Sequence, residues 1–307
     1  MKWYTLFPAL TLFALPMFPF FDIYSSTLDL ALLFGVLTAS WDVLAGFTNY
    51  FNLGQAFMFG LGAYTSALLS VDWGATIPET MAASTLVSAI MGLLIGIPSL
   101  RIKGPYFSIF TLSLPLLFEQ LTFIFPNQLG GERGIFGVHK LSHSLIGSYY
   151  ATLVFALASL LVLYVIGASG TGLILKALGE DEDAVRANGL NPTTYKIFGF
   201  VISSVFAGLS GSVYANVFGF VEPMLFSYSV SLSVVVMGVL GGLGTIAGPF
   251  YAAFLVELLP PALGVGQTEA TIIMTIVVMI LLIRNPSRLH RIIRTEKVKV
   301  EAHPTKR

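Results

Sequence analysis

The sequence predicts an all-α integral membrane protein, a polytopic helical bundle of about ten transmembrane segments. Of its 307 residues, 55% are hydrophobic and only 10% are charged, whereas ordinary soluble domains carry about 25% charged residues. The mean hydropathy of +0.83 supports the same class. Acidic and basic residues number 16 each, so there is no net field to attract nucleic acid, and none is expected as a partner. Cysteine is absent, which excludes disulfides and thiolate metal sites.

Ten stretches are long and apolar enough to cross a bilayer, which requires about 20 mostly apolar residues. The first follows Met1-Lys2 as a signal peptide would, but its three prolines and the lack of a small-x-small cleavage site favour a retained span. The eighth and ninth are the weakest pair, and if they re-enter the membrane without crossing it, eight full spans remain. The approximate ranges are 3–21, 27–47, 54–71, 80–98, 105–125, 149–167, 195–218, 228–246, 247–264 and 268–284.

The positions of Lys and Arg predict the orientation of the chain. If the N-terminus is cytoplasmic and all ten segments cross, 14 of the 16 basic residues lie inside and only Arg133 and Lys140 lie outside. We therefore expect both termini and the 168–196 loop in the cytoplasm, with 126–148 as the longest external loop. The basic tail, residues 285–307, is expected to lie on the anionic lipids of the inner leaflet, which makes membrane lipids a partner.

The cytoplasmic loop is the only long, densely charged segment between hydrophobic stretches. Gly179 is expected to end the preceding helix, and an acidic start predicts a short helix over about 180–188. Gly189 stands where a left-handed cap would fall, while Asn191 and Pro192 have the pattern of a helix N-cap and first position. A helix of about nine residues is marginal in water. It is expected either to dock on another protein or to remain a solvated loop helix.

Four blocks of sequence resemble the branched-chain amino acid permeases of ABC transporters, of the LivM type. They are residues 40–69, 100–114, 179–215 and 235–249, and they occur in the family order. Within the third, Asp183-Ala184-Val185 followed after three residues by Gly189 is similar to the coupling motif of ABC importer permeases, with Asp in place of Glu and Val in place of Ala.

The resemblance implies an inner-membrane permease that works by alternating access. The implied partners are a second, homologous permease subunit, two cytoplasmic ABC ATPase subunits and an extracytoplasmic substrate-binding protein. The chain has no phosphate-binding loop motif, so ATP and Mg are expected in the partner ATPase, with no cofactor and no enzymatic activity in this chain. Residues 1–284 are expected to form a single transmembrane permease domain. The residues expected to couple to the ATPase are Glu182, Asp183, Ala184, Val185, Arg186 and Gly189.

Two glycine-interrupted segments are candidates for the translocation path. A zwitterion with an apolar side chain needs local hydrogen-bonding groups and closely approaching backbone, which Asn52-Leu53-Gly54-Gln55 and the segment from Gly241 to Gly248 offer. The two segments could be related by an internal repeat. The alternative is helix packing through small-x-x-x-small pairs, namely Gly92/Gly96, Gly238/Gly242 and Gly244/Gly248. The path candidates are Asp42, Asn52, Gly54, Gln55, Glu119, Gly241, Gly242 and Gly244.

Three carboxyl groups, those of Asp42, Glu119 and Glu257, fall inside or near the ends of predicted spans, where charge is costly and a role in function is the first hypothesis. The alternative is a neutral or interfacial carboxyl bonded to a neighbouring helix. Asp42 also departs from the family pattern, which has a neutral polar residue there, and Pro115 is expected to interrupt the fifth span. His139 and His143 are four residues apart but have no evident third ligand, so no metal site is predicted.

Two other functions remain open on the sequence. The same class of permease could carry urea, short amides or other amino acids, because specificity in such systems resides largely in the binding protein. A self-sufficient secondary transporter could instead use Asp42 or Glu119 as a proton or ion carrier. No constellation of residues supports a membrane-embedded enzyme.

Overall fold

The computed structural model describes residues 12–18, 21–99, 102, 105–264, 266, 269, 273 and 276. The chain divides into two compact units, Met1–Leu259 and Pro260–Arg307, and the following account concerns the first. Most of the predicted spans 3–21 and 268–284, and the whole basic tail 285–307, lie outside the described residues.

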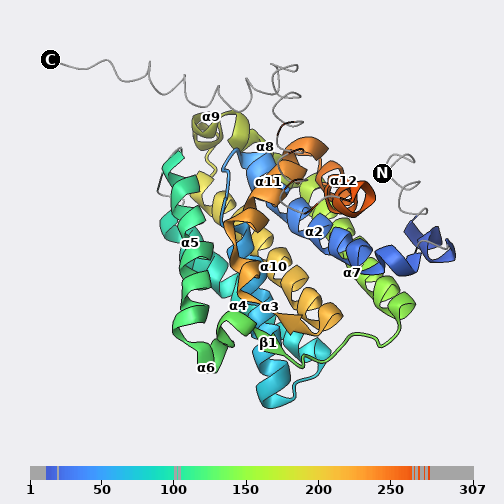
Figure 1. Cartoon of the computed structure of the whole chain (residues 1–307). Helices are drawn as coiled ribbons and strands as arrows, with labels where there is room; N and C mark the ends of the chain where they lie inside the picture. The colour runs from blue at the N-terminus through green and yellow to red at the C-terminus, as the bar shows by residue number, and fades with distance from the viewer. Residues whose placement is uncertain are drawn as a thin grey trace. The chain divides into compact units, whose positions relative to one another are not determined.

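Helices make up nearly all of the described chain (Figure 1). Two short strands, β1 (Ile135–Phe136) and β2 (Phe220–Val221), pair antiparallel with Ile135 opposite Val221. The helices are η2 (Leu15–Met17), α2 (Phe21–Thr48), α3 (Gln55–Trp73), α4 (Ile77–Ser99), α5 (Pro105–Ile124), α6 (Pro126–Leu129), η3 (Gly131–Arg133), α7 (Leu145–Ala168), α8 (Gly170–Glu180), α9 (Glu182–Ala187), α10 (Pro192–Phe218), η4 (Pro223–Phe226), α11 (Tyr228–Gly241) and α12 (Ala247–Leu263).

Five of the described helices, α2, α4, α5, α7 and α10, are long and apolar enough to cross a membrane by length and composition. The helical class is confirmed, whereas a count of about ten spans is not. The third predicted span corresponds to α3, and the eighth and ninth correspond to the shorter apolar helices α11 and α12. The eighth was predicted to run to residue 246, but α11 ends at Gly241 because Gly242 takes a φ of +93°.

Helices α2 and α10 form the centre of the first unit. The most apolar stretch of α2 is 89% buried within the protein and that of α10 is 67% buried, against 22% for α5. Small residues let α10 approach its neighbours closely. A Cβ on Gly62 of α3 would lie 2.0 Å from the backbone oxygen of Gly208 on α10, and one on Gly92 of α4 would lie 2.8 Å from Ser204. Gly92 therefore serves helix packing, as the small-residue alternative predicted.

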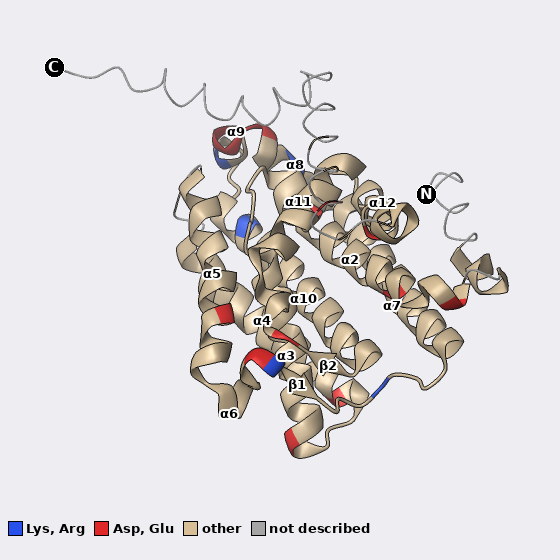
Figure 2. Ribbon diagram, in the orientation of Figure 1, with Lys and Arg blue, Asp and Glu red and all other residues tan. Residues whose placement is uncertain are grey.

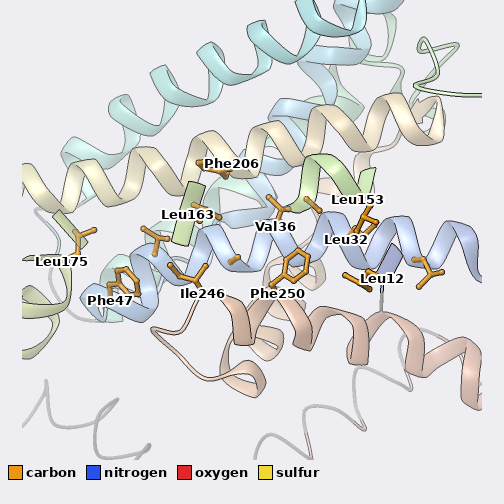
Figure 3. Packing of buried hydrophobic residues seen from close by; sticks show 14 of the residues in the cluster. Leu12, Leu32, Val36, Phe47, Leu153, Leu163, Leu175, Phe206, Ile246 and Phe250 are labelled. Carbon is orange, nitrogen blue, oxygen red and sulfur yellow. The ribbon is translucent and has the colours of Figure 1, made fainter. Parts of the chain in front are cut away.

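A hydrophobic cluster joins α2 to α7, α8 and α12 (Figure 3). Along α2, Figure 3 shows Ile246 beside Phe47, and Phe250 of α12 farther along the same helix. Gly35 of α2 makes room for this contact, because a Cβ there would lie 2.8 Å from the Phe250 ring. The cluster also includes Val185 of α9, so this short helix is packed onto the bundle.

Pro115 does not interrupt the fifth predicted span. Helix α5 continues from Pro105 to Ile124 with Pro115 inside it. A proline removes the hydrogen bond to the carbonyl four residues earlier, which here belongs to Thr111. Gly54 packs against that same carbonyl, since a Cβ on Gly54 would lie 2.5 Å from it. The predicted interruption was wrong, because α5 continues past the one missing hydrogen bond.

The predicted external loop is tied to the end of α10. Besides the β1–β2 pairing, the backbone N–H groups of Gly137 and Val138 both donate to the carbonyl of Gly219, at 3.2 Å each. The rings of Phe136 and Phe220 stack at 5.6 Å with an interplanar angle of 18°. These contacts fix part of the loop on the residue that ends α10.

Candidate coupling segment and translocation path

The charged segment that was predicted to be cytoplasmic folds as two helices. Helix α8 begins after Ser169, whose hydroxyl accepts from the N–H of Gly172, and it continues through Gly179 to Glu180. The prediction that Gly179 ends this helix was wrong. Gly179 is required for close packing instead, because a Cβ there would lie 2.2 Å from the carbonyl oxygen of Phe47 at the end of α2. Its own carbonyl accepts a 2.8 Å hydrogen bond from the Asn49 side chain.

The next helix, α9, is shorter than predicted and is capped at both ends. It covers Glu182–Ala187, and the Asp181 carboxylate caps it by accepting from the backbone N–H groups of Asp183 and Ala184 at 2.9 and 3.0 Å. At its C-terminus, Gly189 has a φ of +80°, its N–H donates to the carbonyl of Arg186, and the N–H of Leu190 donates to that of Val185. This is the Schellman arrangement, which confirms the predicted left-handed cap.

One face of α9 is available to another molecule. The side chains of Asp183, Ala184 and Arg186 and the backbone at Gly189 are exposed, whereas Val185 is only 5% exposed and anchors the helix. Figure 2 shows acidic and basic residues gathered on α9, in contrast to the sparsely charged helices of the bundle. Beside α9 is an open groove of about 650 Å³, lined by Ala177, Glu180, Asp181, Ala184, Val185, Asn188 and Leu190.

Helix α10 starts directly after this segment. The Asn191 side chain accepts from the N–H of Thr193 at 3.0 Å and Pro192 occupies the first turn, as predicted. One turn later, Lys196 is only 3% exposed. Its amino group donates to the carboxylate of Glu182 at 2.5 Å and to the hydroxyl of Tyr50 at 2.8 Å. Glu182 is therefore turned toward the chain's own α10, and it also pairs with Arg186 at 3.4 Å.

The first glycine-interrupted segment, Asn52 to Gln55, covers the end of the loop at residues 49–54 and the first residue of α3. The indole N–H of Trp41 donates to the carbonyl of Asn52 at 2.6 Å. The Asn52 side chain is 3% exposed. It accepts from the N–H of Gly54 at 2.8 Å and donates to the side-chain oxygen of Gln55 at 3.1 Å.

Gln55 links this loop to two central helices. It is 1% exposed, and its amide donates to the hydroxyls of Ser40 on α2 at 3.0 Å and Ser203 on α10 at 3.2 Å. The backbone N–H of Ala56, next in α3, donates to the hydroxyl of Ser231 on α11 at 3.1 Å. Asn52 and Gln55 thus form one buried polar network that involves α2, α3, α10 and α11.

The second segment lies between α11 and α12 and is held by Asp42. One carboxylate oxygen accepts from the N–H of Gly244 at 2.7 Å and the other from the N–H of Ile246 at 2.8 Å. Asp42 is fully buried. Satisfied backbone groups are the condition for irregular structure inside a membrane protein, and here a single carboxylate meets that condition for two of them.

The turn itself depends on close packing between glycines. A Cβ on Gly241 would lie 2.2 Å from the carbonyl carbon of Gly248, and one on Gly248 would lie 2.0 Å from the oxygen of Gly241. A Cβ on Gly242 would meet only the Thr245 methyl group, at 3.9 Å, but Gly242 has a φ of +93°. Gly241 and Gly248 pack against each other, so the last turn of α11 meets the first turn of α12.

The predicted path residues are partly brought together. Trp41 and Asp42, adjacent on α2, hold the first and second interrupted segments respectively. Glu119 lies elsewhere, half-buried on α5. Glu257 is buried on α12, with 6% of its surface exposed.

Sequence reasoning missed two buried charged residues. Lys196 was counted only as a loop charge, although it is the second residue of the predicted span 195–218 and this was a signal. Asp29, near the start of another predicted span, is 4% exposed and accepts from the Ser148 hydroxyl of α7 at 3.4 Å. The rule that marks charged residues inside spans would have found both.

Most of this chain is similar in sequence to known transport permeases. A family model described as "Branched-chain amino acid transport system / permease component" matches residues 23–283. The high-affinity branched-chain amino acid transport system permease protein LivM of Salmonella typhimurium is 31% identical over 267 residues, which cover 76% of this chain and 63% of LivM. LivM of Escherichia coli is 30% identical over 267 residues, which again cover 76% of this chain and 63% of LivM.

A third relative, the tyrosine transport system permease protein of Clostridioides difficile, is 26% identical over 163 residues, covering 52% of this chain and 54% of that protein. The chain spans less than two thirds of the length of the LivM proteins that it matches. No solved structure matches it.

Proposed function

The chain belongs to the family of branched-chain amino acid transport system permease components, and from that premise we propose that it is the membrane permease subunit of an ABC importer. The cargo is leucine, isoleucine or valine. The partners are a second homologous permease, two cytoplasmic ATPase subunits that hold ATP and Mg, and an extracytoplasmic binding protein. The chain is a multi-pass protein of the inner membrane with both termini in the cytoplasm, and it carries out no chemistry on the cargo.

The single observation that supports this function most strongly is α9. A helix of six residues has too few internal hydrogen bonds to be stable alone. Here Asp181 and the Gly189 turn cap it, and Val185 packs it onto the bundle. Asp183, Ala184 and Arg186 remain exposed at its surface. This arrangement is suited to docking on the ATPase, whose ATP-driven closure would displace α9 and, through Asn191 and Pro192, α10.

The two interrupted segments supply the groups that a zwitterion needs. The network of Asn52 and Gln55 offers amide groups close to the backbone of Gly54, and the turn held by Asp42 offers glycine backbone at Gly241, Gly242 and Gly244. Alternating access would open this region first to one side and then to the other. Glu119, half-buried on α5, is the remaining candidate for this path and belongs to neither segment.

The test is reconstitution of the chain in vesicles with its partner permease, ATPase subunits and binding protein. The expected result is ATP-dependent uptake of radiolabelled leucine, isoleucine or valine. Vesicles without the ATPase serve as the control, because uptake there would establish a secondary transporter. A panel of tyrosine, other amino acids, urea and short amides decides the cargo. Preference for tyrosine would favour the role named for the Clostridioides relative over the branched-chain cargo.

A further inference from the structure

Lys196 joins α9, the helix proposed to dock on the ATPase, to the loop at residues 49–54. We propose that it is a positioning residue, which transmits displacement of α9 both to α10 and to the loop at residues 49–54. The inference rests on the proposed function and extends it, since it names the contact by which movement at the ATPase face reaches the polar network.

The contact is short, charged and enclosed. The Lys196 amino group lies 2.5 Å from the Glu182 carboxylate and 2.8 Å from the Tyr50 hydroxyl, and 4.3 Å from the centre of the Tyr50 ring. The Lys196 side chain is 4% exposed and that of Glu182 is 28% exposed. Charge-assisted hydrogen bonds of this length are stronger than neutral ones. Lys196 is the buried member of the pair, and separation from Glu182 would leave its buried charge uncompensated. Glu182, Lys196 and Tyr50 are therefore expected to move together.

Beyond Tyr50, the loop is bonded to three helices. The carbonyl of Phe51 accepts from Ser108 of α5 at 2.7 Å, and the N–H of Leu53 donates to Thr111 of α5 at 3.1 Å. The next contacts are those of Asn52 with Trp41 of α2 and of Gln55 with Ser203 of α10. A shift at Tyr50 therefore changes bonds to residues that the proposed path contains.

Lys196 and Ser203 bind the two ends of this segment from one face of α10. They are seven residues apart, which is about two turns of an α-helix. Lys196 binds Tyr50 before the break and Ser203 binds Gln55 after it. Tyr50 and Gln55 are thus each hydrogen-bonded to α10, and Lys196, which makes the first of these contacts, is also bonded to Glu182 of α9.

A simpler role, in which Lys196 only marks the membrane boundary, does not fit its surroundings. A boundary lysine extends its amino group toward water and headgroups. Lys176 on α8, an exposed lysine, offers a comparison. Its amino group lies 3.4 Å from the carbonyl of Gly167 and 4.4 Å from the centre of the Phe47 ring. Lys196 instead directs its amino group to a carboxylate on α9.

The experiment uses the complete reconstituted transporter and measures leucine taken up per ATP hydrolysed. Lys196→Met removes the charge and retains most of the volume, and Lys176→Met is the matched control. We expect Lys196→Met to lower the uptake per ATP by about fivefold or more, the lower range of coupling between sites, with assembly and ATP hydrolysis maintained. Lys176→Met is expected to retain the wild-type ratio. A purely structural role would reduce the amount of complex and leave the ratio unchanged.

Two further variants decide the matter if Lys196→Met does not assemble. Tyr50→Phe removes one hydroxyl and keeps the ring, and Glu182→Gln removes one charge at a partly exposed position. Both are expected to assemble and to lower the uptake per ATP. A wild-type ratio in Lys196→Met, or in both of these variants, overturns the inference. Absence of ATP-dependent uptake in the wild-type complex overturns the proposed function itself, which keeps the two failures distinct.

Discussion

The carboxylate of Asp42 accepts a 2.8 Å hydrogen bond from the backbone N–H of Ile246, a residue 204 positions later in the chain. Ile246 has a φ of +61°, a conformation that β-branched residues rarely adopt and that costs about 1–3 kcal/mol. Asp42 compensates by satisfying this N–H and that of Gly244 together. The carboxylate therefore stabilises the turn between α11 and α12.

We predict that Asp42→Asn destabilises the protein as well as slowing uptake. An asparagine side chain has one oxygen acceptor where the aspartate has two, so one of the two buried N–H groups loses its partner, at a cost of about 1–3 kcal/mol. Thermal unfolding in detergent should show a lower Tm, with Asp22→Asn as the control because Asp22 is exposed in the first turn of the same helix. An unchanged Tm would show that Asp42 is not required for the turn.

Gly241→Ala should disrupt the contact between α11 and α12. The new methyl group would lie 2.2 Å from the backbone of Gly248 and Pro249, and overpacking of this kind costs about 1–3 kcal/mol. Gly170→Ala is the control, since a Cβ there meets nothing within 4 Å at the start of α8. The measurement is the Tm of each variant, and equal values would contradict the proposed close packing.

Gly189→Leu should uncouple uptake from ATP hydrolysis. There is space for the side chain, but a φ of +80° strains a leucine, because its Cβ crowds the backbone in this conformation. The expected relaxation of this turn would change the position of α9. Gly189→Asn is the control, because asparagine tolerates the left-handed conformation and is expected to preserve uptake per ATP. If both variants show wild-type coupling, the turn does not position α9 for the ATPase.

Gln55→Met should slow uptake by more than the loss of folded protein explains. The change removes the amide that binds Ser40 and Ser203 and leaves the side-chain NH2 of Asn52 without its acceptor, at about 1–3 kcal/mol for each unsatisfied buried group. Gln120→Met, at an exposed position on α5, is the control. Uptake is measured per mole of assembled complex over a range of leucine concentrations. Wild-type kinetics would assign Gln55 to structure alone.

The sequence predicted local features well because their causes are local. The Asn191 cap, the proline at the start of α10 and the left-handed Gly189 each depend on neighbours within five residues. The length of α9 was overestimated because Asp181, read as part of the helix, is its N-cap. Gly179 was misread for another reason: close contact with Phe47, not helix termination, requires a glycine there.

Features that depend on distant residues could not be predicted. Asp42 was identified as unusual for a span, but nothing in its neighbourhood indicates Gly244 and Ile246 as its partners. The pairing of Lys196 with Glu182 crosses a helix end, a glycine turn and a helix start, so no helical spacing reveals it. Both contacts follow from how the helices pack, which composition and hydropathy do not specify.

Helix α10 contacts α9 at one end, and the predicted external loop is bonded to the residue after its other end. Its 27 residues span about 40 Å at a rise of about 1.5 Å per residue. Lys196 lies near one end, and Gly219, which binds Gly137 and Val138, follows the other. As a rigid lever pivoting at its middle, α10 would move each end by about 1.7 Å, in opposite directions, for a tilt of about 5°. That displacement is larger than the difference of about 0.5 Å between the shortest and longest normal N–H···O hydrogen bonds. A small tilt would therefore rearrange contacts at both ends simultaneously.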